Sequence, residues 1–534
     1  MQEVELKLVL DDTFREEELA SRLAAVTAGE ARTATQNDTY LDTPGGELAA
    51  AGLSARVREK GGARRIDVKP VPIDPALVQS RAELTAVLPK RRSPGGVLAR
   101  LLDHELGLTI EPRAVEQLRL VTERRKQVLT AADWSAELCL DEATVFAGDE
   151  VKGGFRELEL ELVAGDEAAF RAFAETLADL PGARADGLSK YQRARRMAGL
   201  PDYRYGRGRP KLRARMSEAE AARHVCRRLY ETMRAHEPGT VAGLDSEQLH
   251  KMRVASRRMR VALTVFRRAF RERNLKPLLE SYKWLAAVLG EVRDLDVHLL
   301  AIPAWQSSLG RTPVEGWRAL EERLLARRDK ARRAMLRGLR SKRYERLCQR
   351  SEELFGDDSP TGEGSEARVG VRARALLTKR AKQFRKTAKA CRKTGDPETL
   401  HELRKLGKKL RYTGEFFRAI LGKAFKARLK DLSRFQDELG LFQDNVVAGE
   451  LARELREEVL AGDRDPALLH VLGLLLGRAV TAGEFGREKA EAALEALDAP
   501  SLMAELTRLL AKSGAGKRKK TGKKTSKKKA RKKS

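Results

Sequence analysis

Apolar and charged side chains alternate along much of the first 200 residues, which is the pattern of β-strands with one buried face. Residues 2–10 place charged side chains at Glu3, Glu5 and Lys7 and apolar side chains between them. Residues 156–162 repeat the alternation, with a glutamate at every second position. Shorter segments carry charges in alternate pairs, at Arg56 and Arg58, at Asp67 and Lys69, and at Arg81 and Glu83.

The pattern becomes almost wholly helical after residue 215. The predicted helices cover residues 218–236, 246–271, 275–288, 295–301 and 314–340, in addition to one amphipathic helix at 13–26. Residues 201–215 combine glycine, proline and many arginines, which indicates a linker. We expect an α+β multidomain protein, with a first domain at 1–200, the linker at 201–215, and a helical domain at 216–505. The halves of the helical domain are expected at about 216–355 and 367–505, around a flexible joint at 356–366.

Strands with one apolar face and one face that carries both charge signs are typical of a barrel with a polar bore. The apolar faces would then pack outward against helices. Arginine and lysine in the bore would bind phosphate oxygens. Clustered glutamates cannot do so, and their expected task is to hold a hard cation such as Mg²⁺ or Mn²⁺.

Charge is spread unevenly along the chain, whose net charge is +29. Residues 1–200 carry 28 Lys and Arg against 34 Asp and Glu, whereas residues 512–534 carry 13 and none. The basic character therefore belongs to the helical domain and the tail, which indicates two separate tasks. The tail has too few apolar residues for a core and is predicted to be disordered. It is either a solubilising segment or, as we favour, an arm that binds polyphosphate or nucleic acid without sequence specificity.

One pattern occurs twice in the helical domain, beginning at His250 and at His401. Basic residues follow each histidine at the same offsets, and these offsets fall on one face of an α-helix. A repeat of this length predicts two equivalent helical units about a pseudo-twofold axis. Each stripe is either a solvated basic face or a site for an extended polyanion, and the repetition favours the second. The proposed polyphosphate-binding residues are His250, Arg253, Arg257, Arg260, His401, Arg404, Lys408 and Arg411.

Several other kinds of site are not supported by the sequence. Each repeated histidine lacks a His or Glu four residues later, so a helical zinc pair is not predicted. Asp294 and Asp444 could form salt bridges with the stripes or bind a metal. The salt-bridge role is at least as well supported as the metal role. The four cysteines are scattered, which is typical of reduced thiols. No signal segment is recognised and the longest apolar run, near 468–476, is too short to span a membrane, so we expect a cytoplasmic protein without membrane contact.

The first 200 residues resemble the CYTH family, the triphosphate tunnel metalloenzymes. The resemblance rests on Glu3-x-Glu5-x-Lys7 together with an ordered series of later motifs. These are Tyr40-Leu41-Asp42-Thr43-Pro44, Leu53…Arg56-x-Arg58, Lys69, Arg81-x-Glu83, Glu157-x-Glu159-x-Glu161 and Ser189-Lys190. Ser54-Ala55 and Asp67 depart from the family pattern, so the substrate preference stays open.

The resemblance implies an eight-stranded antiparallel β tunnel that binds a triphosphate and a divalent metal. It maps Glu3, Glu5, Glu157 and Glu159 to metal binding or water positioning. It maps Lys7, Arg56, Arg58, Lys69, Arg81, Arg124 and Lys190 to triphosphate binding. We assign catalytic roles to Glu157, Glu159 and Lys7, and either glutamate could orient the attacking water.

Residues 214–505 resemble the CHAD family of helical bundles, which is often fused to CYTH domains. The matching motifs are His250-x-x-Arg253, Leu289-Gly290…Arg293-Asp294, His401-x-x-Arg404 and Lys409-Leu410-Arg411-Tyr412. This resemblance implies polyphosphate binding through the basic helix faces.

The two resemblances lead to two hypotheses. The first is an inorganic triphosphatase with Mg²⁺ or Mn²⁺, whose helical domain binds long-chain polyphosphate. The second is a non-catalytic binding protein of polyphosphate granules or the nucleoid. A thiamine-triphosphatase or an adenylate cyclase is a further alternative, although no pocket for a base is recognisable. The sequence lacks a phosphate-binding P-loop motif and identifies no protein partner.

Overall fold

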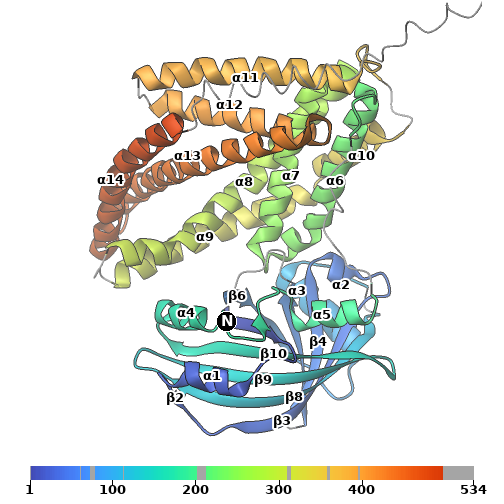
Figure 1. The fold of residues 1–534 in the computed structure, drawn as a ribbon, viewed down its shortest axis with the longest axis vertical. Coiled ribbons are helices and arrows are strands. Elements are labelled where there is room, and N and C mark those ends of the chain that lie inside the picture. Colours follow the sequence, from blue (N-terminus) through green and yellow to red (C-terminus); the bar gives the residue numbers. More distant parts are fainter. Residues whose placement is uncertain are drawn as a thin grey trace, which may run out of the picture. The chain divides into compact units, whose positions relative to one another are not determined.

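The structure is a computed structural model that describes residues 2–60, 62–71, 78–111, 113–200, 212–309, 314–357, 361–394 and 397–496. It divides into two compact units (Figure 1). The first comprises Met1–Gly208 and Tyr230–Ala255, and the second comprises Arg209–Leu229 and Ser256–Ser534. The basic tail at 512–534 and most of the predicted linker lie outside the described residues.

The first unit is built on one antiparallel sheet. Its main strands are β1 (Gln2–Leu10), β3 (Arg32–Asp42), β4 (Leu53–Lys60), β5 (Ala63–Pro70), β6 (Val78–Ala82), β7 (Leu84–Val87), β8 (Val115–Thr130), β9 (Trp134–Ala147) and β10 (Glu150–Gly165). Two short strands, β2 (Thr27–Ala28) and β11 (Ala183–Arg184), are added beside β8 and β1.

The sheet closes on itself through one bent strand. The order is β1-β10-β9-β8-β3-β4-β5-β7, and β6 pairs with β1. Only Glu83 separates β6 from β7, so this segment joins the β5 edge to the β1 edge. Counted as one strand, it completes eight long strands within the described part of the first unit, as the predicted tunnel requires.

The apolar strand faces point outward and are covered by helices. Leu6, Leu8 and Leu160 are fully buried in a core that includes Leu19 of α1 (Glu16–Leu23) and Phe170 of α4 (Glu167–Thr176). Helix α3 (Pro94–Leu106) covers β4 and β5 in the same way, and α2 (Glu47–Ala50) adds to this second core. Each buried leucine contributes about 1.5–3 kcal/mol. Because successive strand residues alternate between faces, burying these leucines forces the charged residues into the bore.

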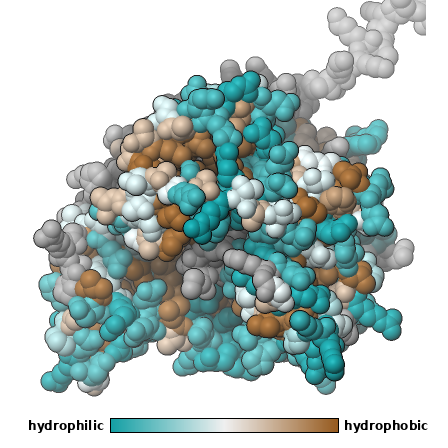
Figure 2. All heavy atoms as spheres, turned by 90° about the horizontal axis from the view of Figure 1, so that it is seen from below, coloured by the Kyte–Doolittle hydropathy of each residue, from teal (hydrophilic) through white to brown (hydrophobic). Residues whose placement is uncertain are grey.

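Apolar side chains on the surface are dispersed. Figure 2 shows a mainly polar face with apolar residues in small separate patches. The exposed large apolar residues of the first unit include Val87 on β7, Val128 on β8, and Val151 and Val163 near opposite ends of β10. Surfaces of this kind are ordinary for globular proteins. No helix in the described ranges combines the length and apolar character needed to cross a bilayer.

The helical part of the chain consists of two similar series. The first is α6 (Glu218–Ala242), α7 (Ser246–Val265), α8 (Glu272–Leu309) and α9 (Val314–Leu339), and the second is α11 (Val369–Thr394), α12 (Pro397–Phe416), α13 (Arg418–Ala461) and α14 (Pro466–Ala496). Helix α10 (Lys342–Phe355) lies between the series. Their lengths correspond: 25 and 26, 20 and 20, 38 and 44, and 26 and 31 residues. His250 and His401 are each the fifth residue of their helix, which agrees with the predicted internal repeat.

Helix α8 differs from its prediction. We expected two helices, at 275–288 and 295–301, and the structure has one continuous helix from Glu272 to Leu309. Gly290 lies buried inside it between the buried Leu289 and Val292. A glycine costs a helix interior about 1 kcal/mol, and the packing of its apolar neighbours outweighs that cost.

The described part of the expected joint, at 356–357 and 361–366, makes backbone contacts within the second unit. Thr361 forms a β-bridge with Phe270, and Arg368 forms one with Ser217. The backbone amide of Gly362 donates to the carbonyl of Ala269 at 2.9 Å. The expected flexible joint therefore belongs, over its described part, to the packed structure of the second unit.

Gly362 tests this packing. A Cβ at this position would lie 2.6 Å from the carbonyl oxygens of Arg268 and Phe270, and backbone atoms cannot move away cheaply. We expect Gly362→Ala to lower the stability of the second unit by at least about 1 kcal/mol. Gly473→Ala is the matched control, because nothing lies within 4 Å of a Cβ there and alanine favours the helix. The measurement is thermal unfolding by calorimetry; equal melting temperatures of the two variants would contradict the prediction.

Candidate active site

Strand register alone lines up the charges in the bore. Lys7 on β1 lies directly opposite Glu159 on β10. Glu157 lies opposite Asp141 on β9, and Asp141 lies opposite Arg124 on β8. Directly opposed residues in an antiparallel pair share a face, so these side chains meet inside the tunnel.

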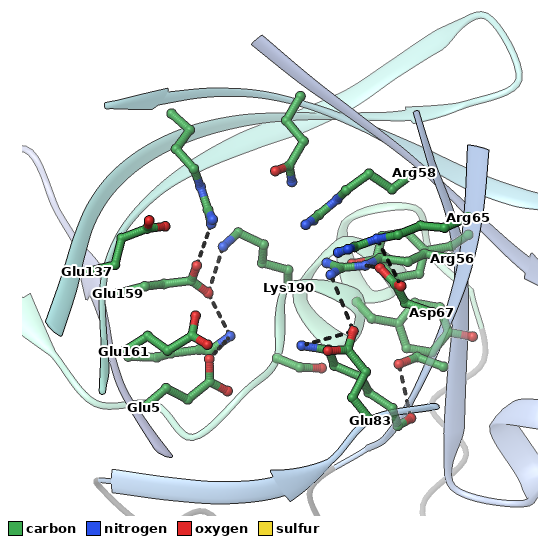
Figure 3. Close-up of a pocket in the computed structure, with 18 of the residues that line it drawn as sticks. Glu5, Arg56, Arg58, Arg65, Asp67, Glu83, Glu137, Glu159, Glu161 and Lys190 are labelled. Atoms are coloured by element: carbon green, nitrogen blue, oxygen red, sulfur yellow. Dashed lines mark hydrogen bonds and ion pairs between the residues drawn. The ribbon is translucent and has the colours of Figure 1, made fainter. Parts of the chain in front are cut away.

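These side chains surround a cavity of about 470 Å³ with two chemically different walls. One wall, from β1, β9 and β10, carries Glu5, Glu137, Glu159 and Glu161. The other, from β4 and β5, carries Arg56, Arg58, Arg65 and Lys69. Figure 3 shows the labelled carboxylates of the acidic wall across the cavity from the labelled arginines, with Lys190 between the two groups.

Lys190 enters the bore from the first residue of helix α5 (Lys190–Met197). Ser189 caps this helix and forms a capping box with Gln192, which fixes where the helix begins. The Lys190 ammonium lies 2.7 Å from Asp141, 2.5 Å from Glu157 and 2.7 Å from Glu159. All four side chains are almost fully buried. A local helix signal thus places a cation among three strand carboxylates.

The buried charges of the acidic side balance one another. Lys7 lies 2.6 Å from Glu159 and 3.0 Å from Glu5, and Arg193 donates to Glu157 at 2.6 Å. Four carboxylates face four cations: Glu5, Asp141, Glu157 and Glu159 against Lys7, Arg124, Lys190 and Arg193. Pairing of this kind is what makes burial of charge tolerable.

The two neighbouring glutamates differ in proton affinity. Burial alone would raise the pKa of Glu159, but Lys190, Lys7 and Arg124 together lower it well below its usual value. Burial raises the pKa of Glu157 in spite of the nearby Lys190. Burial also opposes the charged form of Lys190, yet the surrounding carboxylates raise its pKa above the usual value. Glu159 and Lys190 therefore stay charged at neutral pH.

Buried aspartates hold the arginines of the basic wall. Arg58 donates to both oxygens of Asp38, at 2.7 Å each. Asp67 accepts from Arg56 at 3.2 Å and pairs with Arg65 at 3.1 Å. Such pairs fix a planar guanidinium and present its remaining edge to the cavity. The guanidiniums of this wall are thereby held in fixed positions.

Within the second unit, residues 256–265 of α7 and helix α12 bring the two repeats together. Arg257 donates to the Tyr412 hydroxyl at 2.7 Å. Glu415 accepts from Arg258 at 2.5 Å and from Arg411 at 2.7 Å. One carboxylate therefore neutralises an arginine from each repeat.

Comparison with known families identifies both parts of the chain. A CYTH domain matches residues 1–194 and a CHAD domain matches residues 224–453. The chain is a CYTH–CHAD protein. Members of the CYTH family are triphosphate tunnel enzymes that depend on metals.

Two relatives match most of the chain, and solved structures match parts of it. Two uncharacterized proteins from Mycobacterium tuberculosis, of strains CDC 1551 / Oshkosh and ATCC 25618 / H37Rv, are each 29% identical over 511 residues, which is 89% of this chain and 92% of theirs. The CHAD domain of the plant Ricinus communis is 27% identical with a TM-score of 0.45, over 54% of this chain and 96% of its own. PptA from Streptomyces chartreusis is 17% identical with a TM-score of 0.42, over 52% and 99%. A putative adenylyl cyclase from Hippeastrum, described as having a dominant triphosphatase activity, is 18% identical with a TM-score of 0.27, over 37% and 97%.

Most of the predicted tunnel residues lie on the CYTH cavity. They are Glu5, Lys7, Arg56, Arg58, Lys69, Arg124, Glu159 and Lys190. Glu157 does not line it and lies behind Lys190. Glu3 and Arg81 pair through their backbones in β1 and β6, and their side chains lie outside the described part of the structure.

Several residues of this site were not predicted, among them Glu137, Arg193, Arg65, Asp38 and Asp141. Arg65 continues the alternation of Asp67 and Lys69 on β5, so the sequence held the signal for it. Asp38 and Asp141 had no such signal. Their importance depends on which strand lies beside theirs, and that follows from the sheet order.

The predicted stripe residues of the CHAD domain are all half-buried. Those on α7 are His250, Arg253, Arg257 and Arg260, and those on α12 are His401, Arg404, Lys408 and Arg411. On α12 the off-stripe neighbours Lys405 and Lys409 are exposed, whereas on α7 the neighbours Lys251 and Arg258 are half-buried like the stripe. Asp294 is exposed, and the side chain of Asp444 lies outside the described part. The stripes are therefore not simple solvated faces.

The acidic side of the tunnel fits a divalent cation. Oxygen atoms of Asp141, Glu157 and Glu159 lie within 4.8 Å of one another, and all three residues are buried. Carboxylate oxygens are the donors that Mg²⁺ and Mn²⁺ prefer. A cation, the Lys190 ammonium, already lies among them.

Asp38 offers a test of the preset basic wall. Burial alone would raise its pKa, but Arg56 and Arg58 lower it to about 2. Because the folded-state pKa is below the usual value, Asp38 stabilises the fold above about pH 4, and this contribution is lost as the pH falls through about 2. We expect Asp38→Asn to cost about 2 kcal/mol near pH 6 and much less near pH 2.

The measurement is urea unfolding of both proteins across this pH range. Asp149→Asn, at an exposed turn, is the control and should follow the unaltered protein throughout. A stability difference that does not shrink towards acid pH would rule out the ion-pair role of Asp38.

Proposed function

We propose that the CYTH tunnel hydrolyses inorganic triphosphate with the help of Mg²⁺ or Mn²⁺. The observation that carries this proposal is the closed bore with an acidic wall facing a basic one. A triphosphate brings charge for the basic wall, and its bound cation brings charge for the acidic wall. A basic wall alone would account only for the triphosphate, and an acidic wall alone would account only for the cation.

The residues divide the work by position. Arg56, Arg58 and Lys69 would bind phosphate oxygens, with the arginines held in place by the buried aspartates. Asp141, Glu157 and Glu159 would hold the cation, with Glu5 beside them on the acidic wall, and the cation when bound would neutralise charge on the phosphate oxygens. Phosphoryl transfer to water asks mainly for positioning and for neutralised charge. Of the two candidate glutamates we assign water orientation to Glu159, because it lines the cavity and Glu157 does not.

The lining of the cavity favours an inorganic substrate over a nucleotide or thiamine triphosphate. Among the described lining residues the aromatic ones are Tyr40 and Tyr191. Both are buried, and they stack on each other with ring centroids 5.0 Å apart. Their faces are thus already used, whereas a base or a thiazolium ring would need an aromatic or apolar face of its own.

We propose in addition that the CHAD domain binds long-chain polyphosphate through the two half-buried stripes. Arginines from both repeats meet around Tyr412 and Glu415. A polyphosphate crossing this junction would contact both repeats at once. The alternative is a binding protein without turnover. It would use the same stripes, but its tunnel would not hydrolyse triphosphate.

Phosphate release from tripolyphosphate tests the tunnel. We expect release to require Mg²⁺ or Mn²⁺ and to be much slower with ATP or long-chain polyphosphate. Glu5→Gln should lower turnover at least about 100-fold, because it removes a carboxylate of the acidic wall. Glu150→Gln, which changes an exposed residue, is the control.

Full activity of Glu5→Gln would remove Glu5 from the site. No release from tripolyphosphate by the unaltered protein, together with tight polyphosphate binding, would favour the binding protein instead.

Glu415 tests the CHAD proposal. Its carboxylate competes with phosphate for Arg258 and Arg411. We expect Glu415→Gln to bind long-chain polyphosphate about 3- to 10-fold more tightly, since each freed charge contact is worth up to about 1 kcal/mol. Glu402→Gln removes the same charge from an exposed site on α12 and is the matched control. Equal affinities of the two variants in a mobility assay would place the polyphosphate elsewhere.

A further inference from the structure

The Lys190 ammonium occupies the place that a divalent cation would need. It contacts Asp141, Glu157 and Glu159 at 2.5–2.7 Å. These are the three buried carboxylates whose oxygens converge within 4.8 Å of one another. An ion held by the same oxygens would lie almost on top of the ammonium, and two cations cannot share that volume.

Charge balance points the same way. In the free tunnel the four buried carboxylates already face four cations, as described above. A divalent cation that entered alone would add two positive charges to carboxylates that already have cation partners. A triphosphate that entered alone would add several negative ones. Entry of both together disturbs the balance least.

We propose that Lys190 is the resident counter-ion of the acidic cluster and is exchanged for the divalent cation when a triphosphate arrives. This inference rests on the proposed triphosphate substrate. Lys190 lines the cavity, so its ammonium can leave the carboxylates for phosphate oxygens. The α5 capping box holds the backbone of the helix while the flexible side chain moves. The free tunnel thus rejects the bare cation and accepts the cation–triphosphate complex.

Mn²⁺ binding to the full chain without triphosphate tests the exchange. The readout is the electron paramagnetic resonance signal of free Mn²⁺ during titration, which needs no turnover. We expect weak binding by the unaltered protein and at least about tenfold tighter binding by Lys190→Met, because the carboxylates are then left without their ammonium. The double variant Lys190→Met/Asp141→Asn should lose the gain.

Lys126→Met is the matched control. Lys126 also lines the cavity, but it pairs with Glu137 at 2.8 Å and has no contact with the three carboxylates among the ion pairs of the described residues. It should bind Mn²⁺ as weakly as the unaltered protein. If Lys190→Met does not fold, Lys190→Gln keeps a polar group and serves instead.

Equal Mn²⁺ affinity of the Lys190 variants and the unaltered protein would overturn the exchange. So would tight Mn²⁺ binding by the unaltered protein. Either result would leave phosphate release from tripolyphosphate unaffected, so failure of this inference is distinct from failure of the proposed function.

Discussion

The first unit depends on one constraint: a sheet that buries leucines on its outer face must bury charges on its inner face. Closure of the strands through the β6–β7 segment removes the sheet edge and encloses the charged faces in a bore. Each charge inside must then find a partner. The register supplies these partners, since Lys7 faces Glu159 and Arg124 faces Asp141. The same pairing that makes the fold possible leaves opposite charges ready to separate around a charged ligand.

Both walls rely on ion pairs between carboxylates and cationic side chains. On the basic wall the buried aspartates Asp38 and Asp67 pair with the arginines and fix their positions. On the acidic wall two of the cations, Lys7 and Lys190, are lysines, and an ammonium is a point charge on a flexible chain. Fixed arginines would suit phosphate groups, which vary little in shape. A flexible lysine side chain would suit the proposed exchange of its ammonium for a divalent cation.

Much of this arrangement could be predicted from sequence, and the reasons for the failures are physical. A two-residue period is local, so the buried and charged faces of β1 and β10 were predictable, as was Arg65 on β5. The partners of Asp38 and Asp141 are set by which strands adjoin, and no local pattern encodes that. The helical repeat was visible because matching offsets after His250 and His401 survive in sequence. The continuity of α8 was missed because Gly290 weakens a helix locally, while the packing that outweighs it comes from other helices.

The CHAD junction shows how burial changes the meaning of a basic stripe. Sequence spacing places Arg257 and Arg411 on basic helix stripes, and the repetition of the stripes favours a site for an extended polyanion. In the structure Arg257 is hydrogen bonded to Tyr412, and Arg411 is paired with Glu415. Half-buried guanidiniums with fixed partners are oriented, and oriented donors discriminate by geometry as well as charge. A ligand must therefore offer more than an opposite charge, because its oxygens have to replace the contacts of Glu415 with the arginines. The proposed polyphosphate, a chain of regularly spaced phosphates, would offer such oxygens to the arginines of both repeats at once.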